Sequence, residues 1–307
     1  MDVGGSHVTA AVVDSVALAS ATGAAGVEAR RPLTERAAVV DPHAPLEVLL
    51  EQLTAPGRAI TDLLAGARAG AVRGWVVAMP GPFDYGAGTG SFAGVDKFAS
   101  LAGVDLRAAF AGRLGVVPAD VRFCNDAVAY ALGEWAVGAG RRTRRMVCIT
   151  LGTGVGSAFL EDGVEVVSGA SVPPHGEVHR LAIDGDPLED TMSTPALRRA
   201  FRDRTGQDRS VEEICALARS EDAVAVEVVH TALHALGTAL GPWVHGFGAD
   251  AVVVGGSIAR SWDVIGTPVR DGLRVAGPVV SVVPAALGAR APLLGAAVRW
   301  ERGGAEA

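Results

Sequence analysis

Cysteine is scarce in this chain, with three residues in 307. Cys124, Cys148 and Cys215 are too few and too scattered for a disulfide framework, and the sequence has no Cys-x-x-Cys pair. Disulfide-poor chains are typical of reducing compartments. We therefore expect a cytoplasmic protein.

A basic excess is also absent, because 27 Lys and Arg face 34 Asp and Glu for a net charge of −7. General nucleic-acid binders usually show the opposite balance, so we expect no nucleic-acid partner. The one basic cluster, RRTRR at 141–145, is interpreted as a solvated turn before a strand.

The chain also lacks clear membrane and export signals. Its first residues, MDVGGSH, have neither the charged start nor the apolar run of a signal peptide. Residues 228–249 contain no Lys, Arg, Asp or Glu, as a membrane span would. Three histidines, Pro242 and several glycines favour a buried core helix instead. We therefore expect no membrane partner.

The chain is long and apolar, with 307 residues of which 49% are hydrophobic. This length favours two domains, because single hydrophobic cores stop growing at about 250–300 residues. The pattern predicts strand, glycine turn and strand at 1–14, a helix over 45–69 that Pro56-Gly57 could interrupt, and a buried strand over 72–79. A helix over 106–114 and a strand over 121–124 follow. The strand–turn–strand pattern restarts at 145, which suggests a duplicated α/β unit with a cleft between the copies.

Glycine-rich turns follow three apolar, strand-like runs: DVGGS (2–6), LGTGVG (151–156) and VGGS (254–257). Such turns bring backbone N–H groups close to an anion and tolerate positive φ. Two of them could hold a polyphosphate from both sides. The sequence has neither a P-loop nor a Gly-x-Gly-x-x-Gly after the first strand, which counts against both of those nucleotide folds. Asp2 beside the first turn would repel phosphate unless Mg²⁺ lay between them.

Two adjacent polar residues, Asn125 and Asp126, stand between the strand and the helix in RFCNDAVAYALGEW (122–135). Asn and Asp are favoured at helix starts because they satisfy orphan backbone N–H groups. The pair therefore has two interpretations, a helix cap alone or a cap that also does chemistry. Ser157 in VGSAF lacks the Gly-x-Ser-x-Gly nucleophile pattern, which counts against a hydrolase.

Six segments, in order, resemble the ROK family of sugar kinases and sugar-responsive repressors, within the actin/hexokinase-like ATPase superfamily. They are DVGGS, CNDAVAYALGEW, TLGTGVGSAFLEDG, HGEVH, PLEDTMSTPAL and VVVGGSIARS. The resemblance implies an α/β fold of two ribonuclease-H-like domains around an interdomain cleft. We place these domains at residues 1–122 and 123–290, and expect the last helix, 291–302, to pack back on the first domain.

The resemblance also implies a role for each matching residue. Asp126 corresponds to the general base that takes the proton from the sugar hydroxyl. The implied sugar-binding residues are Gly81, Asn125, Asp126, Glu177, His179 and Glu189. The implied ATP-binding residues are Asp2, Gly4, Gly5, Ser6, Gly152, Thr153, Gly154, Gly156, Gly255 and Gly256, with Asp2 as a Mg²⁺ ligand. The family tendency is a homodimer.

The sequence departs from the family pattern at four places. The interval 180–187 contains no cysteine of the usual zinc motif, so we expect no zinc. The segment before His179 is shortened to GEVH. Gly94, followed by Asp96 and Lys97, stands where many relatives have an asparagine, which suggests a sugar other than plain glucose. The apolar strand expected before Asp2 is missing, which suggests a start codon placed too late or a shortened strand.

These features favour an ATP-dependent kinase acting on the 6-hydroxyl of a hexose, either glucose or an amino sugar such as kanosamine or N-acetylmannosamine. Two alternatives stay open. Polyphosphate-dependent glucokinases resemble this chain in VDK (95–97) and in lacking the zinc motif. A sugar-sensing protein without catalysis is the other, although the N-terminus lacks the winged-helix segment of the repressor branch.

Overall fold

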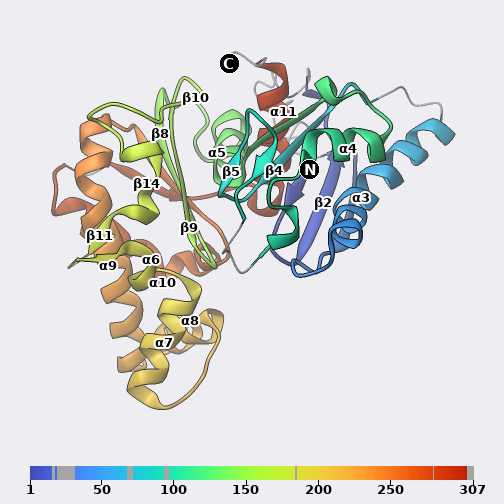
Figure 1. Cartoon of the computed structure of the whole chain (residues 1–307). Helices are drawn as coiled ribbons and strands as arrows, with labels where there is room; N and C mark the ends of the chain where they lie inside the picture. Colours follow the sequence, from blue (N-terminus) through green and yellow to red (C-terminus); the bar gives the residue numbers. More distant parts are fainter. Residues whose placement is uncertain are drawn as a thin grey trace. The chain divides into compact units, whose positions relative to one another are not determined.

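The computed structural model describes residues 1–15, 18, 32–67, 72–92, 97–183, 185–278 and 280–302 (Figure 1). The chain forms two units, one of Met1–Val137 with Ala289–Ala307 and the other of Gly138–Gly288. The first boundary thus falls after residue 137 rather than after 122, because the strand and helix that carry Asn125 and Asp126 belong to the first unit.

A five-stranded sheet forms the centre of the first unit, in the order β3-β2-β1-β4-β7. Its strands are β1 (Asp2–Val3), β2 (His7–Val12), β3 (Thr34–Val39), β4 (Trp75–Met79) and β7 (Val121–Asn125). β1 pairs antiparallel with β2 and parallel with β4, and β4 pairs parallel with β7. The carboxyl ends of β1, β4 and β7 therefore meet at one edge of the sheet.

The second unit repeats this topology in the order β10-β9-β8-β13-β14. Its strands are β8 (Arg145–Leu151), β9 (Val155–Glu161), β10 (Val164–Glu165), β13 (Ala251–Gly255) and β14 (Ser281–Pro284). β8, β9 and β10 form an antiparallel meander, and β13 lies parallel between β8 and β14. The duplication suggested by the glycine hairpins is thus present in the strand order. Two short hairpins complete the strands: β5 (Phe83–Asp84) with β6 (Thr89–Gly90), and β11 (Ala182–Ile183) with β12 (Asp186–Pro187).

The helices of the first unit are α3 (Leu46–Ala67), α4 (Leu106–Leu114), α5 (Asp126–Val137) and α11 (Ala291–Glu301). α3 continues through Pro56, where the sequence pattern allowed a break. A proline inside a helix costs about 3 kcal/mol. Leu49, Leu53 and Ile60 are fully buried on either side of it, and each contributes about 1.5–3 kcal/mol. Burial therefore outweighs the cost of the proline.

Two glycines let α5 and α11 pack backbone to backbone. A Cβ on Gly133 would lie 2.1 Å from the carbonyl oxygen of Ala291, and one on Gly295 would lie 1.7 Å from that of Ala129. α11, red in Figure 1, also contacts β4. The last helix therefore belongs to the core of the first unit, as the resemblance implied.

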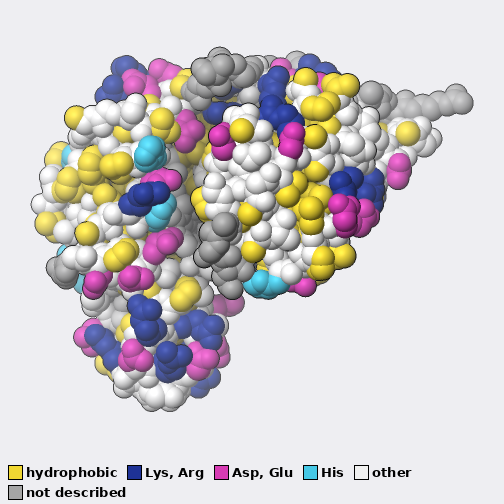
Figure 2. All heavy atoms as spheres, in the orientation of Figure 1, with side chains coloured by type: hydrophobic (Ala, Val, Ile, Leu, Met, Phe, Trp, Pro, Cys, Tyr) yellow, Lys and Arg dark blue, Asp and Glu magenta, His cyan; other side chains and the backbone are white. Residues whose placement is uncertain are grey.

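The helices of the second unit are α6 (Leu188–Thr191), α7 (Thr194–Thr205), α8 (Val211–Arg219), α9 (Ala223–Phe247) and α10 (Trp262–Arg274). By length and hydropathy α9 could cross a membrane. Leu233, Leu236 and Val244 on one of its faces are buried in the core of this unit, as expected for a core helix. Figure 2 shows basic and acidic side chains intermixed over the end formed by α7 and α8.

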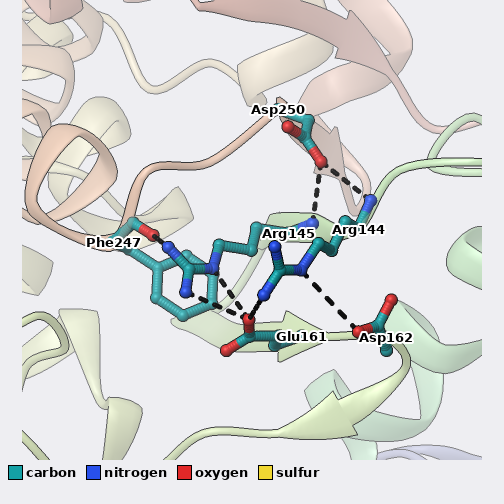
Figure 3. Close-up of polar contacts among 6 residues, drawn as sticks. All are labelled: Arg144, Arg145, Glu161, Asp162, Phe247 and Asp250. Carbon is teal, nitrogen blue, oxygen red and sulfur yellow. Dashed lines mark hydrogen bonds and ion pairs between the residues drawn. The ribbon is translucent and has the colours of Figure 1, made fainter.

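Two arginines of the basic cluster at 141–145, the exposed Arg144 and the half-buried Arg145, take part in a network of ion pairs and hydrogen bonds (Figure 3). Arg144 and Arg145 both pair with Glu161 of β9, at 2.8 and 3.0 Å. Their backbone N–H groups donate to Asp250, and the Arg145 guanidinium donates to the carbonyl oxygen of Phe247. These contacts join the start of β8 to the end of α9, so the solvent-facing turn expected before this strand also holds the strand in place.

Candidate active site

The carboxyl edge of the first sheet gathers the predicted residues of the first unit. Asp2 is in register with Ala78 of β4, and Met79 is in register with Asn125 of β7. Asp126 follows directly as the first residue of α5. The glycine turn after β1 and the Asn-Asp pair after β7 thus lie at the same edge, separated by β4.

Asn125 is the residue that caps α5. Its Oδ1 accepts hydrogen bonds from the N–H groups of Ala127 (2.9 Å) and Val128 (3.2 Å). Its Nδ2 donates to the Tyr85 hydroxyl at 3.0 Å, and this hydroxyl donates to the Met79 carbonyl oxygen at 3.1 Å. The amide is therefore held in one orientation. Tyr85 was missed from the sequence, because nothing in the pattern places the loop after β4 against Asn125.

Gly81 lies in that same loop, and a Cβ on it would come within 3.9 Å of the Tyr85 hydroxyl. The structure therefore brings Gly81, Tyr85 and Asn125 together. This grouping is compatible with the sugar-binding roles predicted for Gly81 and Asn125.

The carboxyl group of Asp126 lies at the start of α5, next to the capping residue. Burial raises its pKa, while the N–H of Ala127, which donates to Oδ1 at 2.8 Å, acts in the opposite direction. The pKa of Asp2 is raised to about 6, first by burial and then by the charge of Asp126. The N-terminal ammonium and His7 oppose that rise. A carboxyl group with a pKa nearer neutrality is suited to accept a proton.

The same two carboxyl groups fit Mg²⁺. Hard oxygen donors are the ligands that Mg²⁺ prefers, and it usually takes one or two carboxylates together with waters and phosphate oxygens. Within the described ranges no three or more His, Cys, Asp and Glu side chains gather as an all-protein metal site. A cation would also relieve the repulsion between the carboxylates of Asp2 and Asp126. Asp2 is therefore the residue that would hold Mg²⁺.

The glycines of the three turns differ in backbone conformation and in the space that they leave. Among them only Gly256 has a positive φ, 86°. A Cβ on Gly256 would lie 2.2 Å from the Leu151 carbonyl oxygen, so this glycine lets the ends of β13 and β8 approach. Gly5 instead leaves room for the side chain of Lys97, and Gly154 for that of Glu189. Gly5 and Gly154 thus leave space for side chains, and of the glycines in the three turns only Gly256 also adopts a left-handed backbone.

Some backbone donors of these turns remain available to an anion. Across the described part of the chain, no acceptor takes the N–H groups of Gly5, Ser6, Thr153 or Gly154. Other donors are used internally: Gly4 donates to His7 and Gly152 donates to Gly154. Gly156 lies in β9, in register with Thr150, and Gly255 ends β13. The free donors fit the phosphate-binding role predicted for the first two turns.

Glu189 lies against the second glycine turn. Its Oε1 accepts a hydrogen bond from the N–H of Val155 at 2.6 Å. Thr194 also donates to the Gly152 carbonyl oxygen at 2.8 Å. The start of α6 and the start of α7 thus brace this turn. One carboxylate oxygen of Glu189 is engaged in bracing, and its predicted contact with sugar remains a prediction for the other oxygen.

Glu177 and His179 share a short segment that Ser157 fixes. The segment forms two 3-10 turns, Pro174–Gly176 and Val178–Arg180. The Ser157 hydroxyl donates to the Gly176 carbonyl oxygen (2.6 Å) and accepts from the Val178 N–H (2.9 Å). Ser157 is thus a positioning residue, a role that sequence reasoning missed. Glu177 forms an ion pair with Arg180, and Glu177 and His179 are both half-buried.

Two further observations concern predicted residues that the structure does not describe and a cavity away from the predicted site. Gly94 and Asp96, the proposed determinants of sugar specificity, lie outside the described residues. A cavity of about 670 Å³ in the first unit is lined by Met1, Trp75, Trp300 and their neighbours, and by none of the predicted site residues. Since Trp75 starts β4, this cavity lies at the other edge of the sheet.

The chain matches the family model described as "ROK family" over residues 1–302. A glucokinase of Thermotoga maritima is 28% identical over 170 residues, covering 48% of this chain and 53% of that protein. This chain therefore matches only about half the length of such a curated relative. The Thermus thermophilus ROK hexokinase superposes with a TM-score of 0.76 at 22% identity, covering 98% of both chains.

A Streptomyces griseus ROK glucokinase solved with glucose and AMPPNP has a TM-score of 0.71 and 24% identity, again over 98% of both chains. A ROK transcriptional regulator, a homologue of the E. coli MLC protein, superposes equally well, with a TM-score of 0.76 at 20% identity over 97% of this chain and 76% of that one. At these identities the likeness shows the two-domain actin/hexokinase-like fold, and fold alone does not separate kinase from regulator. The chain belongs to the ROK family.

Proposed function

We propose that this chain is an ATP-dependent sugar kinase that phosphorylates the 6-hydroxyl of a hexose, either glucose or an amino sugar such as kanosamine or N-acetylmannosamine. One observation carries the proposal. The half-buried Asp126, whose carboxyl pKa is raised by desolvation, lies at the same sheet edge as a glycine turn with free N–H donors. A non-catalytic sugar sensor has no need of a carboxylate of raised pKa at this edge.

In the proposed reaction, Asp126 takes the proton from the sugar hydroxyl as its oxygen attacks the terminal phosphorus of ATP. The bond from that phosphorus to the bridging oxygen breaks, and ADP leaves. Phosphoryl transfer asks the protein mainly for positioning and charge stabilisation. Asn125 and Gly81 are the proposed sugar-binding residues of the first unit. Glu177, His179 and Glu189 are those proposed for the second unit. When bound, Mg²⁺ would supply neutralisation of the phosphate charge.

The remaining ATP contacts are proposed from the turns. Gly4, Gly5 and Ser6 in the first unit, and Gly152, Thr153, Gly154 and Gly156 in the second, would bind phosphates through backbone N–H groups. Gly255 and Gly256 would approach the adenosine. A homodimer and a cytoplasmic location remain predictions from the family and from the composition. Size-exclusion chromatography with light scattering would measure the oligomeric state.

A coupled ADP-release assay over a panel of hexoses and amino sugars tests the proposal. Asp126→Asn should lower kcat by about 10²–10⁴-fold with the best sugar, which is the typical contribution of a general base. Asp62→Asn, an exposed aspartate of α3, is the matched control and should retain full turnover. Full turnover by the Asp126 variant would remove Asp126 as the base. Sugar-dependent thermal stabilisation without ADP release would favour the sensor.

A further inference from the structure

The chain uses lysine once. Lys97 is the only lysine among its 27 Lys and Arg residues, so every other cationic side chain with a permanent charge is an arginine. Lysine and arginine differ chemically, because lysine ends in a compact point charge and arginine in a flat fork. A single lysine in an arginine-rich chain therefore raises the question of what this position needs.

Lys97 lies across the first glycine turn. A Cβ built on Gly5 would lie 2.8 Å from the Lys97 Nζ, 3.1 Å from its Cδ and 3.2 Å from its Cε. The aliphatic stem and the ammonium therefore occupy the space that any side chain at position 5 would need. The absence of a side chain at Gly5 is what lets the ammonium reach the turn.

The backbone beside Lys97 is anchored to the core. The N–H of Phe98 donates to the Pro42 carbonyl oxygen at 2.9 Å, and the Phe98 side chain is buried. Two residues later, the Ser100 hydroxyl donates to the Ala44 carbonyl oxygen at 2.9 Å. The lysine therefore extends from a fixed point toward the turn.

The ammonium of Lys97 has no carboxylate partner in the part of the chain that the structure describes. By contrast, Arg58, Arg73 and Arg113 of the same unit each form an ion pair with a glutamate. The charges that act on nearby Asp2 come from Asp126, the N-terminal ammonium and His7. Lys97 thus offers an uncommitted positive charge next to the free N–H groups of Gly5 and Ser6.

A cation beside unpaired backbone N–H groups is a binding site for phosphate oxygens. We propose that Lys97 contacts the phosphoanhydride chain of the phosphoryl donor at the first glycine turn and neutralises charge on its terminal phosphate. The inference rests on the proposed kinase function. Both ATP and inorganic polyphosphate contain a phosphoanhydride chain. The protection experiment described below distinguishes between these two donors.

The single lysine makes a direct test possible. An uncharged amine acetylating reagent, the N-hydroxysuccinimide ester of acetic acid, should modify one side chain, and peptide mass mapping would report its rate. The other amine, at Met1, is buried and donates to the Val76 carbonyl oxygen. ATP with Mg²⁺ should slow acetylation of Lys97 about tenfold at ten times its Kd, since about one tenth of the protein stays free. Adenosine alone and the sugar alone should leave the rate of Lys97 acetylation unchanged.

The same protection experiment with tripolyphosphate and with long-chain polyphosphate distinguishes between the two possible donors. Protection by ATP but not by either polyphosphate would identify a nucleotide donor, and stronger protection by long-chain polyphosphate would identify a polyphosphate donor. Both outcomes support the contact of Lys97 with the phosphate chain. Inorganic phosphate, run in parallel, measures simple anion screening.

Variants give an independent measurement. Lys97→Met should raise the KM for the donor and lower kcat, with the Kd for sugar unchanged. Lys97→Arg keeps the charge and should recover part of the donor binding. The matched control is Arg58→Met, which removes an exposed cation on α3 and should leave the donor KM unchanged. Thermal melting of each variant verifies that it folds.

The outcomes separate this inference from the proposed function. Turnover with ATP, together with unprotected Lys97 and an unchanged donor KM in Lys97→Met, would overturn the inference and leave the kinase standing. No turnover with any sugar, but protection by ATP or polyphosphate, would support the contact and overturn the kinase. Neither turnover nor protection would overturn both.

Discussion

At the scale of single residues, the carboxyl edge of the first sheet carries two half-buried aspartates, Asp2 and Asp126, whose carboxyl groups are desolvated. The sequence identified Asp2 because it opens the first glycine turn, and Asp126 because it belongs to the Asn-Asp pair between a strand and a helix. For that pair the sequence left two interpretations, a helix cap alone or a cap that also supplies the base. The structure assigns the cap to Asn125 through two backbone N–H bonds. Asp126 is half-buried beside it, and desolvation raises the pKa of its carboxyl group. The role of Asp126 as the base stays a prediction.

Asp2 provides a stability test of this burial. Burial and the charge of Asp126 raise the pKa of Asp2 to about 6 in the folded chain, from the ordinary value of 3.8. The folded state therefore binds the proton more tightly than the unfolded state, and stability falls as the pH rises from 3.8 to 6. Asp2→Asn removes the ionisation and should raise the free energy of unfolding near neutral pH by up to about 3 kcal/mol, with little change below the ordinary pKa.

Urea unfolding in EDTA, at a pH above 6 and at a pH below 3.8, measures this effect. Asp62→Asn, on the exposed side of α3, is the control and should change stability little at either pH. An equal effect of Asp2→Asn at both pH values would show that the carboxyl group is not desolvated in the fold.

At the scale of elements, glycine placement decides which helices can touch. The sequence predicted the helix over 106–114 and the terminal helix correctly, because apolar spacing and end signals are local. It did not predict that Gly133 and Gly295 let α5 and α11 meet at backbone distance. In the second unit, Gly237 and Gly272 play the same part between α9 and α10, where added Cβ atoms would lie 2.4 and 2.1 Å from carbonyl oxygens.

Gly295→Ala should therefore destabilise the first unit. The new Cβ would lie 1.7 Å from the Ala129 carbonyl oxygen, so α11 must shift away from α5. Overpacking of this kind typically costs about 1–3 kcal/mol, measured by chemical denaturation. Gly112→Ala is the matched control, because that helical glycine is exposed and its Cβ would meet nothing within 4 Å. The control should be neutral or gain up to about 1 kcal/mol from helix propensity. Equal behaviour of the two variants would refute the close helix contact.

At the scale of the whole molecule, the chain contains two cores with one topology. The large apolar cluster of the second unit contains only residues from Val147 to Val282. The first unit has its own cluster, from Met1 to Phe123, and is completed by a helix from the far end of the chain. The glycine hairpins signalled the repeat. The boundary was misplaced because the strand that ends at Asn125 completes the first sheet.

A fragment of residues 138–288 should consequently fold alone, with a cooperative urea transition followed by circular dichroism. A fragment of residues 1–137 lacks α11 and leaves the face of α5 around Ala129 and Gly133 uncovered, so it should be less stable or aggregate. Joining 289–302 to its C-terminus through a flexible linker should restore cooperative unfolding. Failure of 138–288 to fold would mean that the second core depends on the first.

The sequence by itself determined the strand and turn order, the duplicated α/β pattern, the family and the list of candidate site residues. These depend on local periodicity and on motifs, which the linear order preserves. Only the tertiary structure decided that Tyr85 orients Asn125, that Ser157 and Glu189 brace their loops, and that Lys97 reaches Gly5. Each of those relations joins residues distant in sequence, and such contacts depend on packing that no local pattern encodes.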